Sequence, residues 1–211
     1  MTSLKSGKLF IVSGASGTGK TTLCKLLVAE HPKCKISVSF TTRKARDYES
    51  NGVHYHFIER EEFEAKIKNE DFLEWAEVFG NYYGTCKKQI DHYLNEGFTP
   101  VFDIDRQGAA SLKKAYGDDA LLVFLLPPSF EELKKRLFGR KSDSEEVIKE
   151  RLKHSLYELR TCLEYDFVLL NEDLESCYSD LLTILAGKSF DDKKFRDLVG
   201  EILSNIDSDD L

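Results

Sequence analysis

The chain has 211 residues, of which 41% are hydrophobic and 32% are charged, a composition typical of a folded protein with a substantial core. Its formal net charge of −7 would repel the phosphates of DNA and RNA, so general nucleic-acid binding is excluded and any anion site must be local. The five cysteines form no CxxC pair and no apolar run approaches the roughly 20 residues of a membrane span, so we expect a cytoplasmic protein without membrane contact.

Apolar strands and amphipathic helices alternate along much of the chain. The first strand is predicted over 8–12, and a helix marked by Leu23 and Leu27 follows it. A strand with period-two alternation is predicted next, over 35–40. Later strands are predicted over 99–105, 120–126 and 166–171, and a last helix over about 191–206. This alternation indicates an α/β fold with a parallel sheet that has helices on both faces.

The segment from about 35 to 97 departs from this alternation. It contains a second alternating run over 53–58, a helical pattern over 59–69, and two strand patterns that meet around Gly80-Asn81 as in a hairpin. We therefore expect a small mixed or antiparallel insertion after the first strand and helix.

A G-x-x-x-x-G-K-[ST] motif joins the first predicted strand to its helix. Its members are Gly14, Ala15, Ser16, Gly17, Thr18, Gly19, Lys20 and Thr21. The glycines allow backbone N–H groups to converge on a phosphate, Lys20 can reach the β and γ phosphates, and Thr21 can meet Mg²⁺. A glycine-rich turn that merely caps a helix would not explain Lys20-Thr21. Asp103 and Asp105 close a later apolar strand, where a Walker-B-like acid would lie near the metal.

Three cations, Arg43, Lys44 and Arg46, follow the strand predicted over 35–40. The planar guanidinium groups of the two arginines can both hold one phosphate, and the phenols of Tyr55 and Tyr83 can donate hydrogen bonds to the same oxygens. The alternative is a solvated basic loop without a ligand.

Glu74 stands in a run rich in aromatic residues, FLEWAEVF. A carboxylate there could accept two parallel hydrogen bonds, which is what the N1–H and N2–H₂ edge of guanine offers and what adenine does not. The alternative is an ordinary surface charge on a strand.

At this point the sequence resembles the guanylate kinases, from about residue 7 to about residue 186. The resemblance is carried by the ordered motifs SGASGTGKTTL, SVSFTTRKAR, NGVHYHF, FLEWAEVFGNYYGT, DIDRQG, PPSFEELKKRL and VLLNEDL. It implies transfer of the γ-phosphoryl group of ATP to GMP or dGMP, with Mg²⁺. It also implies a P-loop core over about 7–34 and 98–186, a GMP-binding insertion over about 35–97 and a helical lid over about 137–146. Residues 187–211 would then form a helical extension with an acidic tail.

The resemblance also implies roles for particular residues. It implies ATP contacts for Gly14, Ala15, Ser16, Gly17, Thr18, Gly19, Lys20, Thr21, Thr22, Arg136, Arg140 and Asn171. It implies GMP contacts for Ser39, Arg43, Arg46, Tyr55, Glu74, Tyr83, Thr85 and Asp105. Catalytic roles fall on Lys20, Arg43, Arg140 and Arg151, and metal contacts on Thr21 and Asp103, partly through water.

Two positions depart from the family pattern. Ala45 stands where the TTR-x-P-R motif has proline, which leaves the loop less stiff, and Lys141 follows the lid arginine where glycine is common. Two rival functions remain: a catalytically inactive binding module of this family, which the complete P-loop opposes, and a P-loop kinase with another acceptor, which Glu74 and the two tyrosines oppose. The last helix could cover a sheet edge or mediate self-association, so the sequence leaves monomer and homodimer open.

Overall fold

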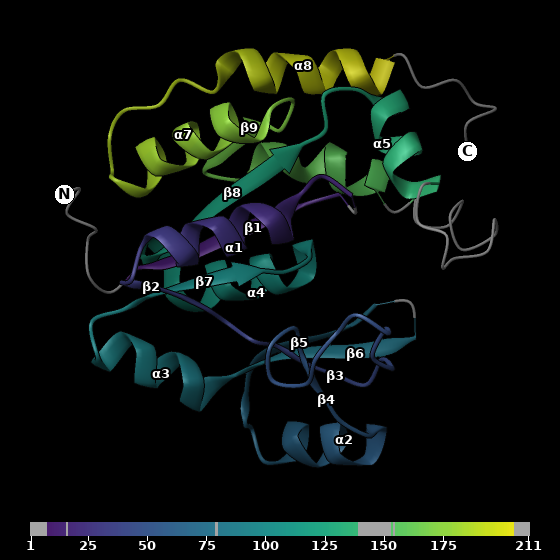
Figure 1. Ribbon diagram of the computed structural model, residues 1–211, viewed down its shortest axis with the longest axis vertical. Helices are drawn as coiled ribbons and strands as arrows, with labels where there is room; N and C mark the ends of the chain where they lie inside the picture. Colours follow the sequence, from purple (N-terminus) through teal and green to yellow (C-terminus); the bar gives the residue numbers. More distant parts are fainter. Residues whose placement is uncertain (1–7, 16, 79, 139–152, 154, 205–211) are drawn as a thin grey trace.

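The computed structural model describes residues 8–15, 17–78, 80–138, 153 and 155–204. Figure 1 shows a larger lobe built around one sheet and, below it, a smaller lobe built around a second sheet. The first sheet has five strands in the order β2-β7-β1-β8-β9, and the second has four in the order β4-β3-β6-β5.

The core sheet is parallel throughout. Its strands are β1 (Leu9–Gly14), β2 (Cys34–Ile36), β7 (Thr99–Asp103), β8 (Ala120–Leu126) and β9 (Phe167–Leu170). The central strand β1 is buried along its whole length, and Ile11 lies beside Phe102 on one neighbour and Leu122 on the other. Such continuous apolar strands are expected where helices cover both faces of a sheet. The predicted α/β fold is therefore confirmed.

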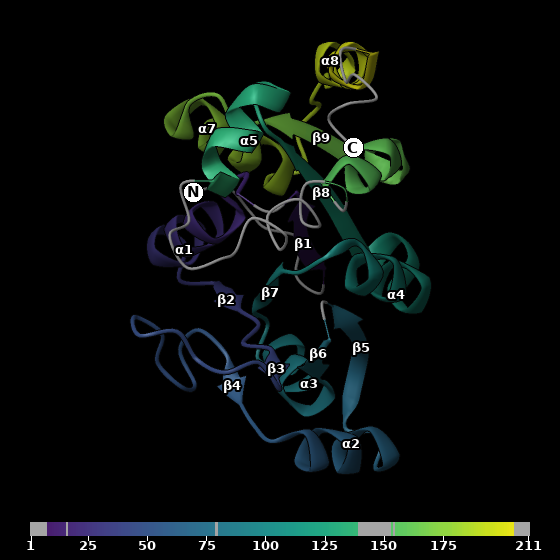
Figure 2. The ribbon, with the colours of Figure 1, turned by 90° about the vertical axis from the view of Figure 1, so that its right-hand side faces the viewer.

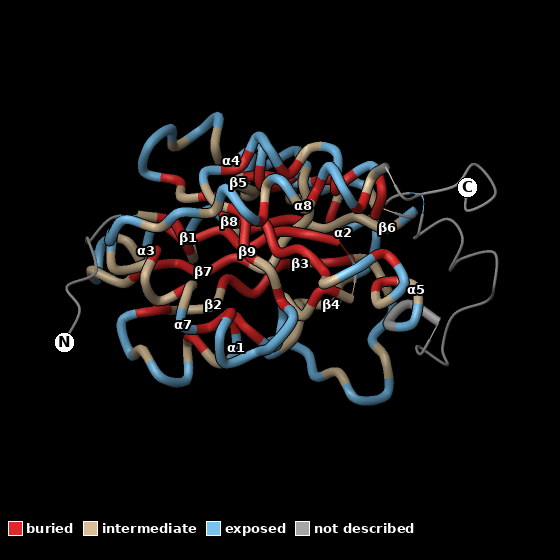
Figure 3. The backbone as a smooth tube through the Cα atoms, turned by 90° about the horizontal axis from the view of Figure 1, so that it is seen from above, coloured by how far each residue is buried: buried red, intermediate tan, exposed pale blue. Residues whose placement is uncertain are grey.

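Helices cover this sheet on two sides (Figure 2). They are α1 (Lys20–Glu30), α4 (Arg106–Tyr116), α5 (Phe130–Phe138) and α7 (Leu174–Leu185), with short 3₁₀ turns at Gly117–Asp119 and Cys162–Glu164. α1 and α7 contact each other on one side, and α4 lies on the other side against β1 and β8. Figure 3 shows the resulting core as a band of buried backbone between exposed helical surfaces. At the start of α5 the N–H of Glu132 donates to Oγ of Ser129, which is a capping contact.

The last helix, α8 (Lys193–Ser204), packs along β9, the edge strand of the core sheet. Its inward side chains, Phe195, Val199 and Ile202, are buried. Just before it, the carboxylate of Asp192 accepts a hydrogen bond of 2.8 Å from the N–H of Val168 on β9. The C-terminal helix therefore covers a sheet edge, as one of the two alternatives predicted.

Replacing Asp192 with alanine should lower thermal stability. The N–H of the buried Val168 would lose its acceptor, and Arg196 would lose its ion pair of 2.9 Å with the same carboxylate. The unsatisfied buried donor alone costs about 1 to 3 kcal/mol. For a chain of this size we expect the melting temperature to fall by about 3 to 10 °C in calorimetry. Asp191→Ala is the matched control, because Asp191 is exposed and accepts only from the helix, at the N–H of Lys193. Equal losses in the two variants would mean that neither the contact with β9 nor the ion pair with Arg196 contributes to stability.

The second sheet is mixed. Its strands are β3 (Phe40–Thr41), β4 (His56–Phe57), β5 (Phe72–Val78) and β6 (Asn81–Cys86), and its lobe also contains α2 (Arg60–Lys68). β5 and β6 form the predicted antiparallel hairpin, in which Gly80 has a φ of 74°. The ring of Phe63 on α2 stacks on Phe72 and on Tyr82, which holds the helix against the sheet.

Three details of this region differ from the prediction. The alternating run over 35–40 is not one strand: Cys34–Ile36 pairs with β7 in the core sheet, and Phe40–Thr41 belongs to the second sheet. The alternation of apolar and polar residues in the sequence continues because only three residues separate the end of β2 at Ile36 from the start of β3 at Phe40. The expected start of the insertion, about residue 35, thus falls inside a core strand. Of the run over 53–58, only His56–Phe57 is a strand, and helix α3 (Lys87–Asn95) was not predicted.

Candidate active site

A cavity of about 870 Å³ lies between the two lobes. Its walls include Lys20 and Thr21 from the start of α1, Arg43 from the loop after β3, Glu74 from β5 and Tyr83 from β6. The glycine-rich motif, the basic cluster and the buried carboxylate, which are far apart in the sequence, therefore face one space.

The glycine-rich loop connects β1 to α1 as predicted. The backbone of Gly19 has a φ of 95°, and a Cβ there would lie 2.4 Å from Nδ2 of Asn171, so only glycine fits. The side chain of Lys20 folds over the loop, where Nζ donates to the carbonyl oxygens of Gly14 and Ala15 at 2.5 and 3.0 Å. The ammonium group is thus held at the place where the loop closes.

The loop is braced from behind. Oγ1 of the buried Thr18 donates to the carbonyl of Ala15 at 2.8 Å, and Nδ2 of Asn171 donates to the carbonyl of Thr18 at 2.7 Å. Asn171, expected to contact ATP, is buried and supports the loop in this way. Gly17 and Thr22 line the cavity, and Ser16 lies outside the described residues.

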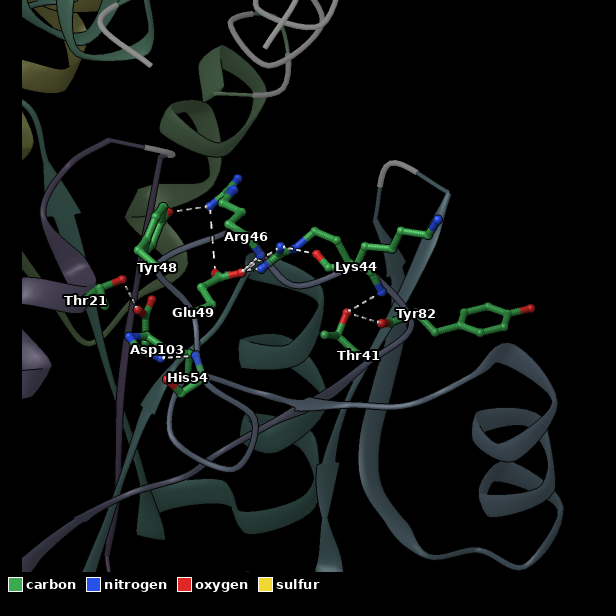
Figure 4. A network of polar contacts seen from close by, with 11 residues as sticks. Thr21, Thr41, Lys44, Arg46, Tyr48, Glu49, His54, Tyr82 and Asp103 are labelled. Carbon is green, nitrogen blue, oxygen red and sulfur yellow. Dashed lines mark hydrogen bonds and ion pairs between the residues drawn. The ribbon is translucent and has the colours of Figure 1, made fainter. Parts of the chain in front are cut away.

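Thr21 and Asp103 meet at the carboxyl end of the core sheet. Oγ1 of Thr21 donates to Oδ2 of Asp103 at 2.5 Å, and both residues line the cavity (Figure 4). A hydroxyl and a carboxylate are the oxygen ligands that Mg²⁺ takes alongside substrate phosphates, so the pair fits the metal contacts expected there. Within the described part of the chain, no group of three or more histidine, cysteine, aspartate or glutamate side chains could hold a metal ion on its own.

The basic cluster contains an acidic residue that the sequence interpretation missed. The guanidinium of Arg43 donates to both carboxylate oxygens of Glu49, at 2.9 and 2.8 Å, and the N–H of Arg46 donates to the same carboxylate at 2.8 Å (Figure 4). Burial alone would raise the pKa of Glu49, but these hydrogen bonds outweigh it and hold the pKa below its usual value. A carboxylate thus lies between the two arginines, and the spacing of three residues from Arg46 to Glu49 was the available signal.

The two predicted tyrosines flank Arg43. The rings of Tyr55 and Tyr83 meet edge to face with centroids 5.9 Å apart, and the Arg43 guanidinium lies 5.4 Å from the centre of the Tyr55 ring. Burial and the nearby Asp103 raise the pKa of the Tyr55 phenol, so it stays a hydrogen-bond donor. Cations and phenolic donors gather here as a phosphate site requires.

Glu74 is buried, with 9% of its surface exposed, and is not the surface strand residue of the alternative interpretation. Burial raises the pKa of its carboxyl to about 7, the charge of Asp105 adds to this, and a hydrogen bond of 2.5 Å from Oγ1 of Thr85 opposes it. Ser39 and Asp105 line the cavity beside Glu74, while Thr85 is fully buried with its hydroxyl directed to Glu74. The oxygen Oδ1 of Asp105 also accepts from the N–H of Gly108 and caps α4.

The expected lid lies almost wholly outside the described residues. Arg140, Lys141 and Arg151 fall in the part of the chain that is not described, as does the side chain of Arg136, whose backbone belongs to α5.

The guanylate kinase family model matches residues 6–188 of the chain. The chain belongs to the guanylate kinase family. The resemblance found in the sequence is therefore confirmed, and α8 follows the matched span. Among the described residues, no helix has the length and apolar character needed to cross a membrane.

Individual members of the family align over most of the chain. A guanylate kinase from Neisseria gonorrhoeae is 44% identical over 205 residues, covering 97% of this chain and all of the relative. One from Fusobacterium nucleatum is 49% identical over 179 residues, covering 85% of this chain and 96% of the relative. The crystal structure of guanylate kinase from Anaplasma phagocytophilum superposes with a TM-score of 0.71 at 31% identity and covers 94% of this chain and 96% of that one.

Proposed function

We propose that this chain transfers the γ-phosphoryl group of ATP to GMP or dGMP and releases ADP with GDP or dGDP. The observation that carries the proposal is that a P-loop lysine, a paired-arginine cluster and a buried carboxylate line the same cavity. Membership of the guanylate kinase family supports the same reaction. The net charge of −7 supports small nucleotides rather than nucleic acid as partners, and a cytoplasmic location is part of the proposal.

The smaller lobe would bind the acceptor. Glu74, with its second oxygen facing Gly108, would accept the two donors of the guanine edge, and Ser39, Thr85 and Asp105 would complete the base site. The phosphate of GMP would take the place between Arg43, Arg46, Tyr55 and Tyr83. The carboxylate of Glu49 already holds the guanidinium of Arg43 and the backbone N–H of Arg46, so this turn is organised before the phosphate arrives.

The larger lobe would bind the donor. The loop from Gly14 to Thr22 would hold the phosphates of ATP, and Thr21 and Asp103 would hold Mg²⁺, directly or through water. When bound, Mg²⁺ neutralises part of the phosphate charge. The family resemblance implies that the ATP site is completed by Arg136, Asn171, Arg140 and Arg151. The last two lie outside the described residues.

Transfer itself needs alignment and neutralisation of charge rather than a covalent intermediate. In the proposed mechanism, Lys20 leaves the carbonyls of Gly14 and Ala15 and donates to the oxygens of the transferred group. Arg43 fixes the acceptor phosphate so that one of its oxygens attacks in line. The insertion would close over GMP and the lid over about 137–146 would close over ATP, and this closure would exclude water.

Arg43→Ala and Arg46→Ala should each raise the KM for GMP by about ten- to a hundredfold, since each removes a charge-assisted hydrogen bond to a partly buried phosphate. The KM for ATP should hardly change, because both residues lie on the acceptor side of the cavity. Steady-state kinetics with each substrate varied in turn would test this. Equal rises for both substrates would show that the cluster is not specific to the acceptor.

The reaction can be tested directly with a coupled assay of ADP release. ATP and Mg²⁺ would be supplied with GMP, dGMP, AMP, UMP or CMP in turn. We expect turnover with GMP and dGMP, and little with the others, because adenine and the pyrimidines lack the pair of donors that Glu74 would accept. A preference for another acceptor would contradict the assignment of the base site, and the absence of any turnover would favour the inactive binding module.

A further inference from the structure

The two arginines of the acceptor cluster are held in different ways. Both terminal nitrogens of Arg43 donate to the carboxylate of Glu49. Arg46 uses its backbone N–H for that carboxylate, and its Nη1 remains 4.0 Å from Oε1. The same Nη1 donates to the phenolic oxygen of Tyr48, 3.1 Å away. The direction of the Arg46 guanidinium is thus determined mainly by Tyr48.

Tyr48 lies on the wall of the nucleotide cavity although 69% of it is exposed to solvent. In the view of Figure 4 its ring stands between Arg46 and the Thr21–Asp103 pair. Because Tyr48 lines the same cavity as Arg43 and Arg46 and its hydroxyl contacts Arg46, a phosphate held by these arginines would lie beside the ring and reduce its exposure to water.

We propose that Tyr48 is a positioning residue of the acceptor site, whose hydroxyl holds the Arg46 guanidinium toward the acceptor phosphate and whose ring is covered when GMP binds. The inference rests on the proposed function. A hydroxyl suits this task because it orients a guanidinium without neutralising its charge, whereas a second carboxylate would compete with the phosphate. Glu49 then anchors the backbone of Arg46 and Tyr48 directs its side chain.

The first test compares Tyr48→Phe with the matched control Tyr157→Phe. Tyr157 is also exposed, at 52%, but its ring faces Arg106 at 5.0 Å, on α4. Tyr48→Phe should raise the KM for GMP about three- to tenfold, the effect of one lost hydrogen bond, and leave the KM for ATP and the melting temperature unchanged. Tyr157→Phe should leave both KM values unchanged. An unchanged KM for GMP in Tyr48→Phe would overturn the proposal.

The second test follows the ring in the wild-type protein. Tetranitromethane nitrates accessible tyrosines, and mass spectrometry of the digested protein identifies them one by one. GMP should protect Tyr48 and leave Tyr157 reactive, while ATP alone should protect neither. Nitration of Tyr48 at the same rate with saturating GMP would overturn the proposal. Calorimetric titration of GMP into the wild-type protein separates this failure from failure of the proposed function, in which no GMP binding would be detected.

Discussion

Replacing Lys20 with alanine is expected to lower kcat by at least about a hundredfold, because the negative charge that develops on the transferred group loses its counter-charge. The ammonium group donates to two carbonyls of its own loop, and Lys20 lies on the wall of the cavity. The fold should therefore persist. Rapid-quench or coupled kinetics would measure kcat, and calorimetry would measure the melting temperature.

A suitable control for this variant is Lys88→Ala, which removes an exposed lysine from α3 and changes the net charge equally. Its kcat should match that of the wild-type protein. Near-normal turnover of Lys20→Ala would remove the lysine from the proposed mechanism, and a collapse of the melting temperature would show that the loop depends on it structurally.

Glu74→Gln should lower kcat/KM for GMP by at least about a hundredfold, because one acceptor oxygen becomes an NH₂ that faces a donor of guanine in a buried site. Such sites discriminate strongly, since a mismatch leaves buried groups unsatisfied. Selectivity for GMP over AMP should shrink in parallel. Glu77→Gln, at an exposed position on the same strand, is the matched control and should behave as wild type. Unchanged GMP kinetics in Glu74→Gln would mean that guanine is read elsewhere.

The raised pKa of Glu74 also predicts a dependence on pH. Only the ionised carboxylate accepts both guanine donors, so the KM for GMP should rise as pH falls below about 7, the value to which burial raises this pKa. The rise should be absent in Glu74→Gln. A KM for GMP that stays constant from pH 8 to about pH 6 would argue against an ionised Glu74 in the base site.

As pH rises, the stability of the fold should decrease while the affinity for GMP increases. The pKa of Glu74 is higher in the folded chain, at about 7, than its ordinary value of 4.5. Its favourable contribution to folding is therefore complete below pH 4.5 and is lost as pH rises through 7. At pH 8 the Glu74→Gln variant should melt roughly 10 °C above the wild-type protein, and the difference should disappear near pH 4.5. Above pH 7, therefore, the same residue that would bind guanine lowers the free energy of unfolding of the protein.

The parts of the site that could be predicted are those whose residues lie close together in the sequence. The P-loop follows from eight consecutive residues between a strand and a helix, and the paired arginines stand three residues apart in one turn. The three-residue spacing from Arg46 to Glu49 indicates that these residues are close, but the contacts that Glu49 and Tyr48 make depend on how the turn after Arg46 folds back. The burial of Glu74 likewise depends on packing between the hairpin and α4, since Gly108 lies against its carboxylate.

The errors in the predicted fold also arise from contacts that a local sequence pattern does not specify. Periodicity indicates that one face of a segment is buried, but it does not say which sheet buries it. The run over 35–40 therefore looked continuous although it serves two sheets. Helix α3 is short, yet Ile90, Tyr93 and Leu94 have helical spacing and could have revealed it.

The contact between Asp192 and Val168 has a consequence for assembly. An unoccupied edge strand can pair with the edge of another molecule, and so extend a sheet from one chain into the next. Here α8 occupies the β9 side, and the carboxylate of Asp192 takes the hydrogen bond that a neighbouring strand would make. A homodimer formed through β9 would first have to release this helix. Removing the segment after residue 188 would take away Asp192 and α8, so the outward N–H groups of β9 could pair with a strand of another chain.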